Sequence, residues 1–145
     1  MPLIDDCVFC KIIRGEIPSC KLYEDDQVLV FLDIAPFNSG HALVVPKDHH
    51  HSITTLPAEY HAKIMEAATK TAVAQMRTLK AEGFNLVLNN GRCAGQEVPH
   101  VHLHVIPRFV DDQPIFKASK KKYDSTEEMQ KIAEKIRARL SEKNE

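Results

Sequence analysis

The sequence predicts an α+β fold in which a mainly antiparallel sheet of five strands packs against one long helix, with a second helix at the C-terminus. Three observations predict it: strand-like runs separated by turn formers, one long helical period in mid-chain, and no helix between the last two strand-like runs. With a single long helix among the strands, repeated βαβ units are excluded and an antiparallel sheet follows.

Three strand-like runs open the chain. Val28–Asp33 and His41–Pro46 are rich in branched apolar residues, and a cluster containing Pro and Gly separates them. Because a polar turn precedes the first of these runs, Lys21–Tyr23 is expected to pair with it as a short strand. The last two strand-like runs are Phe84–Asn89 and Val101–Pro107.

Two amphipathic helices are predicted. In the first, apolar side chains recur every three or four residues from Tyr60 to Leu79, with Pro57 near its start and Gly83 just past its end. The second follows Ser125 and Glu128, which have the spacing of a capping box. Its apolar positions are Met129, Ile132, Ala133, Ile136 and Leu140.

The length and composition fit one domain. The chain has 145 residues, of which 43% are hydrophobic, enough to close one core. We expect residues 1–110 to form the main body, and residues 111–145, a solvated connector followed by the last helix, to belong to the same domain.

Charge and composition exclude several classes of partner. With 19 basic and 20 acidic residues the chain lacks a broad cationic field, so no nucleic acid polymer is expected and the partner should be small. No apolar run is long enough for a membrane span, and the acidic N-terminus does not resemble a secretory signal, so we expect a cytoplasmic protein. Its four cysteines are expected to be reduced thiols or metal ligands.

The most informative segment is His100–Ile106, in which polar and branched apolar residues alternate. Because strand side chains alternate between faces, the apolar residues are expected in the core and three histidines on the opposite face, roughly 6.6 Å apart: His100, His102 and His104. A histidine is mostly neutral and nucleophilic at cytoplasmic pH, and a backbone carbonyl can fix its tautomer. The middle histidine is the best placed nucleophile for phosphoryl chemistry.

Two other interpretations fit the same spacing. His-x-His with a third histidine can hold a catalytic zinc with an open water position. Alternatively, the histidines merely line a solvated strand face.

His100–Ile106 resembles the His-φ-His-φ-His-φ-φ signature of the histidine triad superfamily of nucleotide-binding hydrolases. Other segments also look like family segments, in family order: Asp6–Ile13, Phe31–Pro36, Gly40–Lys47 and Gly95–Val98. The resemblance covers roughly Asp6 to Phe109. It implies a homodimer whose two sheets join into one, and no catalytic cofactor.

The resemblance also implies residue roles. His102 would attack the α-phosphorus of a purine nucleotide conjugate and form a nucleotidyl-histidine, with His104 on the phosphate oxygens and the His100 carbonyl orienting His102. His41 would support the triad and Asp33 would bind the ribose. The purine would lie against Phe9, Ile12 and Ile34, and the phosphate and leaving group against Asn89, Gly95, Gln96, Glu97 and the backbone of Val98.

Glu97 departs from the pattern of the eukaryotic purine phosphoramidases, which have a serine that donates a hydrogen bond to the departing nitrogen. An ionised carboxylate cannot donate, so either its pKa is raised, another group protonates the amine, or the leaving group is already a good one. The expected activity is hydrolysis of purine nucleoside phosphoramidates or related conjugates. The alternatives are diadenosine polyphosphate hydrolysis and a nucleotide-binding regulatory module with incidental hydrolysis.

Cys7-x-x-Cys10 has the spacing of two zinc-binding thiolates. The resemblance implies that His49 and His100 complete a structural zinc site, although His50 and His51 leave the first of these ligands open. The other interpretations are a redox pair, which would need a βαβ context, and two free buried thiols.

Overall fold

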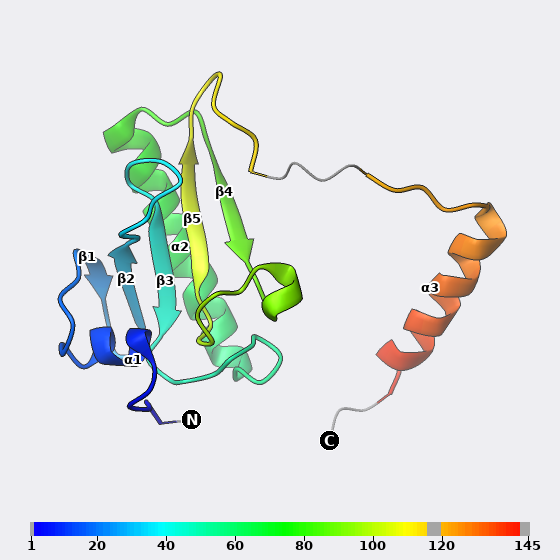
Figure 1. The fold of residues 1–145 in the computed structure, drawn as a ribbon, viewed down its shortest axis with the longest axis horizontal. Coiled ribbons are helices and arrows are strands. Elements are labelled where there is room, and N and C mark those ends of the chain that lie inside the picture. The colour runs from blue at the N-terminus through cyan, green and yellow to red at the C-terminus, as the bar shows by residue number, and fades with distance from the viewer. Residues whose placement is uncertain (1, 116–119, 143–145) are drawn as a thin grey trace. The chain divides into compact units, whose positions relative to one another are not determined.

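The computed structural model describes residues 2–115 and 120–142 (Figure 1). Its chain divides into two compact units, Met1–Asp112 and Gln113–Glu145. Each unit is described by itself below. That both belong to one domain stays a prediction.

The first unit contains the five-stranded sheet that the sequence predicts. Its strands are β1 (Lys21–Glu24), β2 (Val28–Leu32), β3 (Ala42–Pro46), β4 (Gly83–Leu88) and β5 (Leu103–Arg108). They lie in the order β1-β2-β3-β5-β4, and every neighbouring pair is antiparallel. The α+β fold class is thereby confirmed.

The long helix α2 (Ala58–Leu79) covers one face of the sheet, behind the strands in Figure 1. Its buried stripe, which includes Ile64, Ala68 and Ala72, packs against alternate residues of the strands, and Val101, Leu103 and Val105 join that core as expected. The opposite face of the sheet packs against the short helix α1 (Val8–Ile13) through Phe9, Cys10 and Ile12. The sheet is therefore buried on both faces near the histidines.

Several boundaries differ from the sequence prediction. α2 ends at Leu79 because Lys80 adopts a left-handed conformation with φ of 61°, and Gly83 begins β4 instead of terminating the helix. Its N-cap, Pro57, makes no side-chain capping bond. The strand around the histidines begins at Leu103, two residues later than predicted, since pairing to β3 and β4 starts there.

Two short elements were not predicted. α1 contains only the six residues VFCKII, too few to show a helical period, and it is capped by the Cys7 sulfur, which accepts from the Cys10 N–H at 3.4 Å. A single 3-10 turn, η1 (Arg92–Ala94), lies between β4 and β5, flanked by Gly91 and Gly95 with φ of 96° and 94°. Both glycines occupy a region of φ that other residues rarely adopt.

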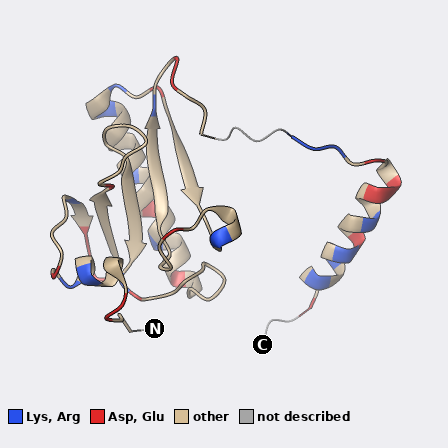
Figure 2. Ribbon diagram, in the orientation of Figure 1, with Lys and Arg blue, Asp and Glu red and all other residues tan. Residues whose placement is uncertain are grey.

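The second unit carries α3 (Thr126–Leu140), which confirms the predicted C-terminal helix. Its capping box is formed: the Ser125 hydroxyl accepts from the Glu128 N–H at 3.1 Å, and the Glu128 carboxylate accepts from the Asp124 N–H at 2.7 Å. Basic and acidic positions are interspersed along the ribbon of this helix in Figure 2.

Within the described residues, no helix combines the length and the apolar character that a membrane crossing requires. Along the ribbon of the first unit, basic and acidic positions of the described residues are interspersed over helices and loops (Figure 2).

Candidate active site and metal centre

Two of the three histidines of the motif precede β5, and the third is the second residue of that strand. His100 and His102 precede the strand and are 0% and 5% exposed, whereas His104 lies within it and is half-buried. The rings of His102 and His104 are neighbours, with centroids 4.9 Å apart. The ring of His100 is directed to a different group of partners, so the three histidines do not converge on one point.

His102 is held by the backbone of His100. Its Nδ1 lies 2.7 Å from the His100 carbonyl oxygen. Because a carbonyl can only accept, Nδ1 carries the proton, and in the neutral ring Nε2 presents its lone pair. Nε2 makes no hydrogen bond to a described residue and is not among the buried nitrogens left without a partner, so solvent reaches it. This is the geometry of an available nucleophile.

Burial lowers the pKa of His102, opposed by the hydrogen bond to His100 and by the negative charges of Asp33 and Glu97. The neutral, nucleophilic form is therefore favoured at neutral pH. The Phe9 ring packs edge-on against the imidazole with centroids 5.0 Å apart, which limits the ring's rotation.

A chain of hydrogen bonds fixes the tautomer of His104. The Phe37 N–H donates to His41 Nδ1 at 3.0 Å, so His41 carries its proton on Nε2. His41 Nε2 then donates to His104 Nδ1 at 2.9 Å, and the neutral His104 keeps its own proton on Nε2. Burial lowers the pKa of His104 to about 4, so the ring is neutral near pH 7. His104 is thus arranged to donate one N–H to an anionic oxygen.

The predicted nucleoside contacts lie around these rings with different exposure. Asp33 follows β2; one carboxylate oxygen accepts from the Ala35 N–H at 2.9 Å and the other lies 3.7 Å from His41 Nε2. Ile34 is 99% exposed, whereas Phe9 and Ile12 are buried, and the Phe9 ring packs against His100 and His102. A purine contact for these three residues stays a prediction, and Ile34 offers the most free surface.

The predicted phosphate contacts come from the end of β4 and the loop that follows it. Leu88 pairs with Leu103 across the two strands, so Asn89 lies next to His102 in the register. A β-carbon on Gly95 would lie 3.6 Å from the Asn89 amide nitrogen, which places Gly95 and Asn89 in van der Waals range. Val98 is half-buried and Glu97 is exposed.

Gln96 is bound within this loop. Its Oε1 accepts from the Gly91 N–H at 2.7 Å, and its Nε2 donates to the carbonyls of His51 at 2.7 Å and Val98 at 3.0 Å. Both ends of the amide are therefore engaged inside the protein. A direct phosphate contact by Gln96 stays a prediction, while its observed role is to hold the loop in place.

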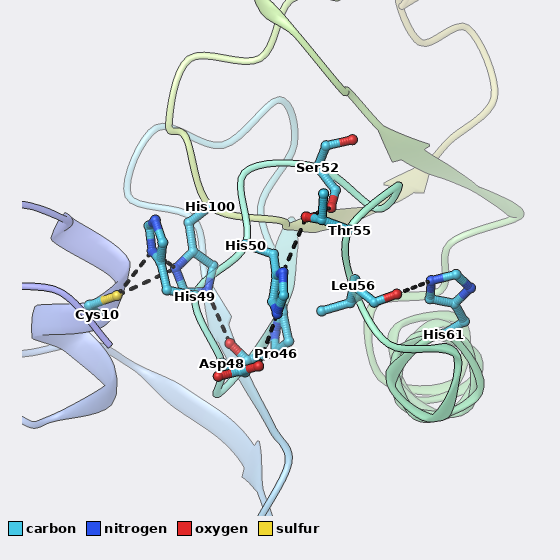
Figure 3. A network of polar contacts seen from close by, with 10 residues as sticks. All are labelled: Cys10, Pro46, Asp48, His49, His50, Ser52, Thr55, Leu56, His61 and His100. Atoms are coloured by element: carbon cyan, nitrogen blue, oxygen red, sulfur yellow. Dashed lines mark hydrogen bonds and ion pairs between the residues drawn. The ribbon is translucent and has the colours of Figure 1, made fainter. Parts of the chain in front are cut away.

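The Cys pair and two histidines form a compact cluster of metal-ligand atoms. His49 Nδ1 lies 3.2 Å from His100 Nδ1 and 3.3 Å from Cys10 Sγ, and His100 Nδ1 lies 3.4 Å from Cys7 Sγ and 3.6 Å from Cys10 Sγ. Tetrahedral zinc with ordinary bond lengths places two nitrogen ligands about 3.3 Å apart and a nitrogen and a sulfur about 3.6 Å apart. The four donors have the spacing of a structural zinc site, and Cys10, His49 and His100 are seen to converge in Figure 3.

The tautomer of His100 also suits a metal. Its Nε2 lies 2.9 Å from the Pro46 carbonyl and must donate to it, so Nδ1 faces the cysteines with a lone pair. Burial lowers the pKa of His100 to about 4, which keeps the ring neutral, as ligation requires. Burial raises the pKa of the Cys10 thiol, so binding a cation there would release a proton.

The structure distinguishes the three consecutive histidines. His49 Nδ1 faces the cluster, and its Nε2 is buried without a partner in the described part of the chain. His50 is engaged elsewhere, 2.9 Å from the Asp48 carboxylate and 3.1 Å from the Thr55 hydroxyl (Figure 3). His51 is exposed. Of the three, His49 is the residue that the fold brings to the cysteines.

Sequence reasoning missed the groups that fix the two tautomers. They are the Phe37 N–H, which acts on His104 through His41, and the Pro46 carbonyl, which acts on His100. Both are main-chain atoms, and every residue type carries a main-chain carbonyl, so the sequence does not show which one will bind. It also missed Arg92, which lines a cavity of about 800 Å³ together with Gln96, Glu97 and Pro99. The only signal for that residue was a basic side chain two positions after Asn90 in a glycine-containing loop.

Comparison with known proteins agrees with this geometry. The model of the HIT domain matches residues 14–111. An uncharacterized HIT-like protein of Methanocaldococcus jannaschii is 50% identical over 111 residues, spanning 77% of this chain and 85% of that protein. An adenosine 5′-monophosphoramidase of Schizosaccharomyces pombe is 39% identical over 134 residues, spanning 92% and 98% of the two chains.

A solved structure is similar over almost the same length. The crystal structure of a Zn-bound histidine triad family protein from Mycobacterium smegmatis is 38% identical, with a TM-score of 0.72, and the match covers 93% of this chain and 95% of that one. The family model, the relatives and the five-stranded fold lead to one conclusion. The chain belongs to the histidine triad (HIT) family.

Proposed function

We propose that this protein hydrolyses purine nucleotide conjugates, nucleoside phosphoramidates in particular, at the α-phosphorus through a covalent intermediate on His102. The observation that carries the proposal is the 2.7 Å bond from His102 Nδ1 to the His100 carbonyl, which leaves Nε2 as a lone pair in contact with solvent. A relative that covers nearly the whole chain is named as an adenosine 5′-monophosphoramidase, which supports the substrate class.

The reaction would proceed in two displacements. His102 Nε2 attacks the α-phosphorus, the bond from phosphorus to the leaving nitrogen or oxygen breaks, and the leaving group takes a proton from solvent, which the attacking water restores in the second step. Water then attacks the same phosphorus, the bond to Nε2 breaks, and the nucleoside monophosphate is released with the free imidazole. The His104 Nε2–H would donate to a phosphoryl oxygen whose charge grows in each transition state.

The remaining predicted contacts fit around this centre. Asp33 would accept hydrogen bonds from ribose hydroxyls, Ile34 would contact the purine, and Asn89 would approach the phosphate from beside His102. The metal-dependent alternative has less support, because neither group of possible metal ligands among the described residues includes His102.

Replacing His102 with alanine tests the mechanism. Turnover of an adenosine phosphoramidate should fall by at least about a thousandfold, while nucleotide affinity stays largely intact. Mass spectrometry of wild-type protein quenched during turnover should show an added adenylyl group on His102. Full activity of the alanine variant, or an adduct on another residue, would overturn the assignment.

We further propose that Cys7, Cys10, His49 and His100 bind one structural zinc ion. Four protein ligands leave no position for a water nucleophile, so the ion would stabilise the fold and supply no catalytic hydroxide. Elemental analysis of the purified protein should find one zinc per chain, with loss of the metal in Cys10→Ser and His49→Asn and retention in His51→Asn. Loss in the His51 variant alone would show that the ligand is misassigned.

The homodimer and the cytoplasmic location are also proposals. Strand β4 lies at one edge of the sheet, where pairing with a second copy would extend it.

A further inference from the structure

The cavity beside His102 offers room for a part of the substrate other than the nucleoside. It is lined by His51, Arg92, Gln96, Glu97 and Pro99, and none of its lining residues is a predicted purine or ribose contact. Gly95 also lines it, and a β-carbon on Gly95 would lie 3.6 Å from the amide nitrogen of Asn89, the residue next to His102 in the register, so the cavity adjoins the nucleophile. A group attached to the α-phosphorus on the side away from the nucleoside would extend into it.

Arg92 is presented to this cavity by a well-defined piece of backbone. It begins η1, and the Gly95 N–H donates to its carbonyl at 3.0 Å. The Gln96 amide closes the turn by accepting from the Gly91 N–H at 2.7 Å, and it attaches the turn to the segment after β3 by donating to the His51 carbonyl at 2.7 Å. The position of the Arg92 α-carbon is thereby fixed by contacts that do not involve its side chain.

Among the residues that the structure describes, none supplies a bound counter-charge to the Arg92 guanidinium. It makes no ion pair or hydrogen bond with any residue that the structure describes, and Glu97, the anionic residue of the same cavity, makes none either. Arginine stays charged at any physiological pH and binds carboxylates and phosphates through paired N–H donors. The cavity thus holds a cation that has no ion pair with a described residue and is available to bind an anion.

On the basis of the proposed hydrolase function, we infer that Arg92 is a specificity-determining residue that selects nucleotide conjugates whose leaving group carries a negative charge. The shared chemistry is an anionic oxygen group on the leaving side, either a carboxylate on a departing amine or a further phosphate.

A matched pair of substrates isolates this effect. Adenosine phosphoramidates of glycine and of glycinamide differ only by a carboxylate in place of an amide, and a dinucleoside tetraphosphate supplies the phosphate arm. For each, kcat/KM is measured in wild type, Arg92→Gln and Arg92→Lys. Arg77→Gln, which removes an exposed cation from the last turn of α2 that does not line the cavity, is the control.

Arg92→Gln should lower kcat/KM for the glycine conjugate or the tetraphosphate by roughly threefold to tenfold, the range for a partly solvated charge pair, and leave the glycinamide conjugate unchanged. Arg92→Lys should retain part of the preference and Arg77→Gln all of it. The arm that loses more activity identifies carboxylate or phosphate as the selected anion. An equal fall for charged and neutral conjugates, or no fall for either charged one, overturns the inference.

A binding experiment separates the role of Arg92 from the catalytic role of His102. Binding of the same two phosphoramidates to His102→Ala protein, which needs no chemistry, should show the charge preference and its loss in the His102→Ala, Arg92→Gln double variant. A preference in binding without adenylylation of His102 in wild type would refute the mechanism and keep the role of Arg92. Adenylylation of His102 without any charge preference would support the mechanism and refute the role of Arg92.

Discussion

The Gln96 amide makes three hydrogen bonds in the loop beside His102, and we expect its replacement by alanine to destabilise the fold. The amide is 9% exposed and makes three hydrogen bonds, at 2.7, 2.7 and 3.0 Å. Each such bond contributes a net ~0.5–1.5 kcal/mol, so the free energy of unfolding should fall by about 1.5–4.5 kcal/mol. For a domain of this size the Tm should fall by about 5–15 °C.

Thermal unfolding followed by circular dichroism in zinc-saturated buffer measures this effect, since partial loss of the metal would change the Tm by itself. Gln96→Glu keeps the size and one acceptor but faces the carbonyls of His51 and Val98 with a group that cannot donate. It should be at least as unstable near pH 7. Gln130→Ala makes the same change on the exposed surface of α3 and should shift the Tm little. A Gln96→Ala protein within about 2 °C of wild type would refute the role of the amide.

Two further predictions follow from single contacts. Replacing His41 with phenylalanine removes the donor to His104 Nδ1, so the His104 ring can adopt either tautomer. We expect kcat/KM to fall about tenfold to a hundredfold and ¹⁵N NMR of His104 to show a mixture of tautomers. A single unchanged tautomer would contradict the hydrogen-bond chain. The Arg108 guanidinium, together with the Asn38 amide, holds the pKa of Asp112 at about 2. A lowered pKa stabilises the fold above the carboxyl's ordinary range and loses that effect as pH falls toward 2, so Asp112→Asn should have a lower Tm than wild type at pH 7, with the difference shrinking between about pH 4 and 2. A difference independent of pH would point to packing alone.

The alternation around the histidines was sufficient to predict which residues enter the core. Val101, Leu103 and Val105 pack against α2, because the period of two in the sequence matches the alternation of faces in extended chain. The same alternation overstated the length of the strand, since His100 and His102 lie before the first paired residue. Extended backbone and ladder pairing are separate properties, and the sequence pattern reports only the first.

The shared face of the three histidines did not imply a shared partner. Their side chains leave the same side of the chain, yet the ring of His100 joins Cys7, Cys10 and His49 while His104 joins His41. Which ring meets which partner depends on contacts with α1, β3 and the segment after β3, all distant in the sequence. Similarly, Gln96 was assigned from its place in a motif as a substrate contact, but the carbonyls that occupy its donors cannot be read from residue identity.

The two halves of the site are coupled through one residue. The side chain of His100 offers Nδ1 to the cysteine cluster and donates from Nε2 to Pro46, while its carbonyl accepts from His102. The Val101 N–H also donates to the His50 carbonyl at 2.8 Å, which ties the peptide after His100 to the segment that carries His49. Whatever fixes His100 and His49 therefore fixes the carbonyl that accepts from His102 Nδ1. In the proposed mechanism, a metal bound at this cluster would act on catalysis by restricting the backbone that carries this carbonyl, without touching the phosphate. This role is consistent with a ligand set that leaves no position for water.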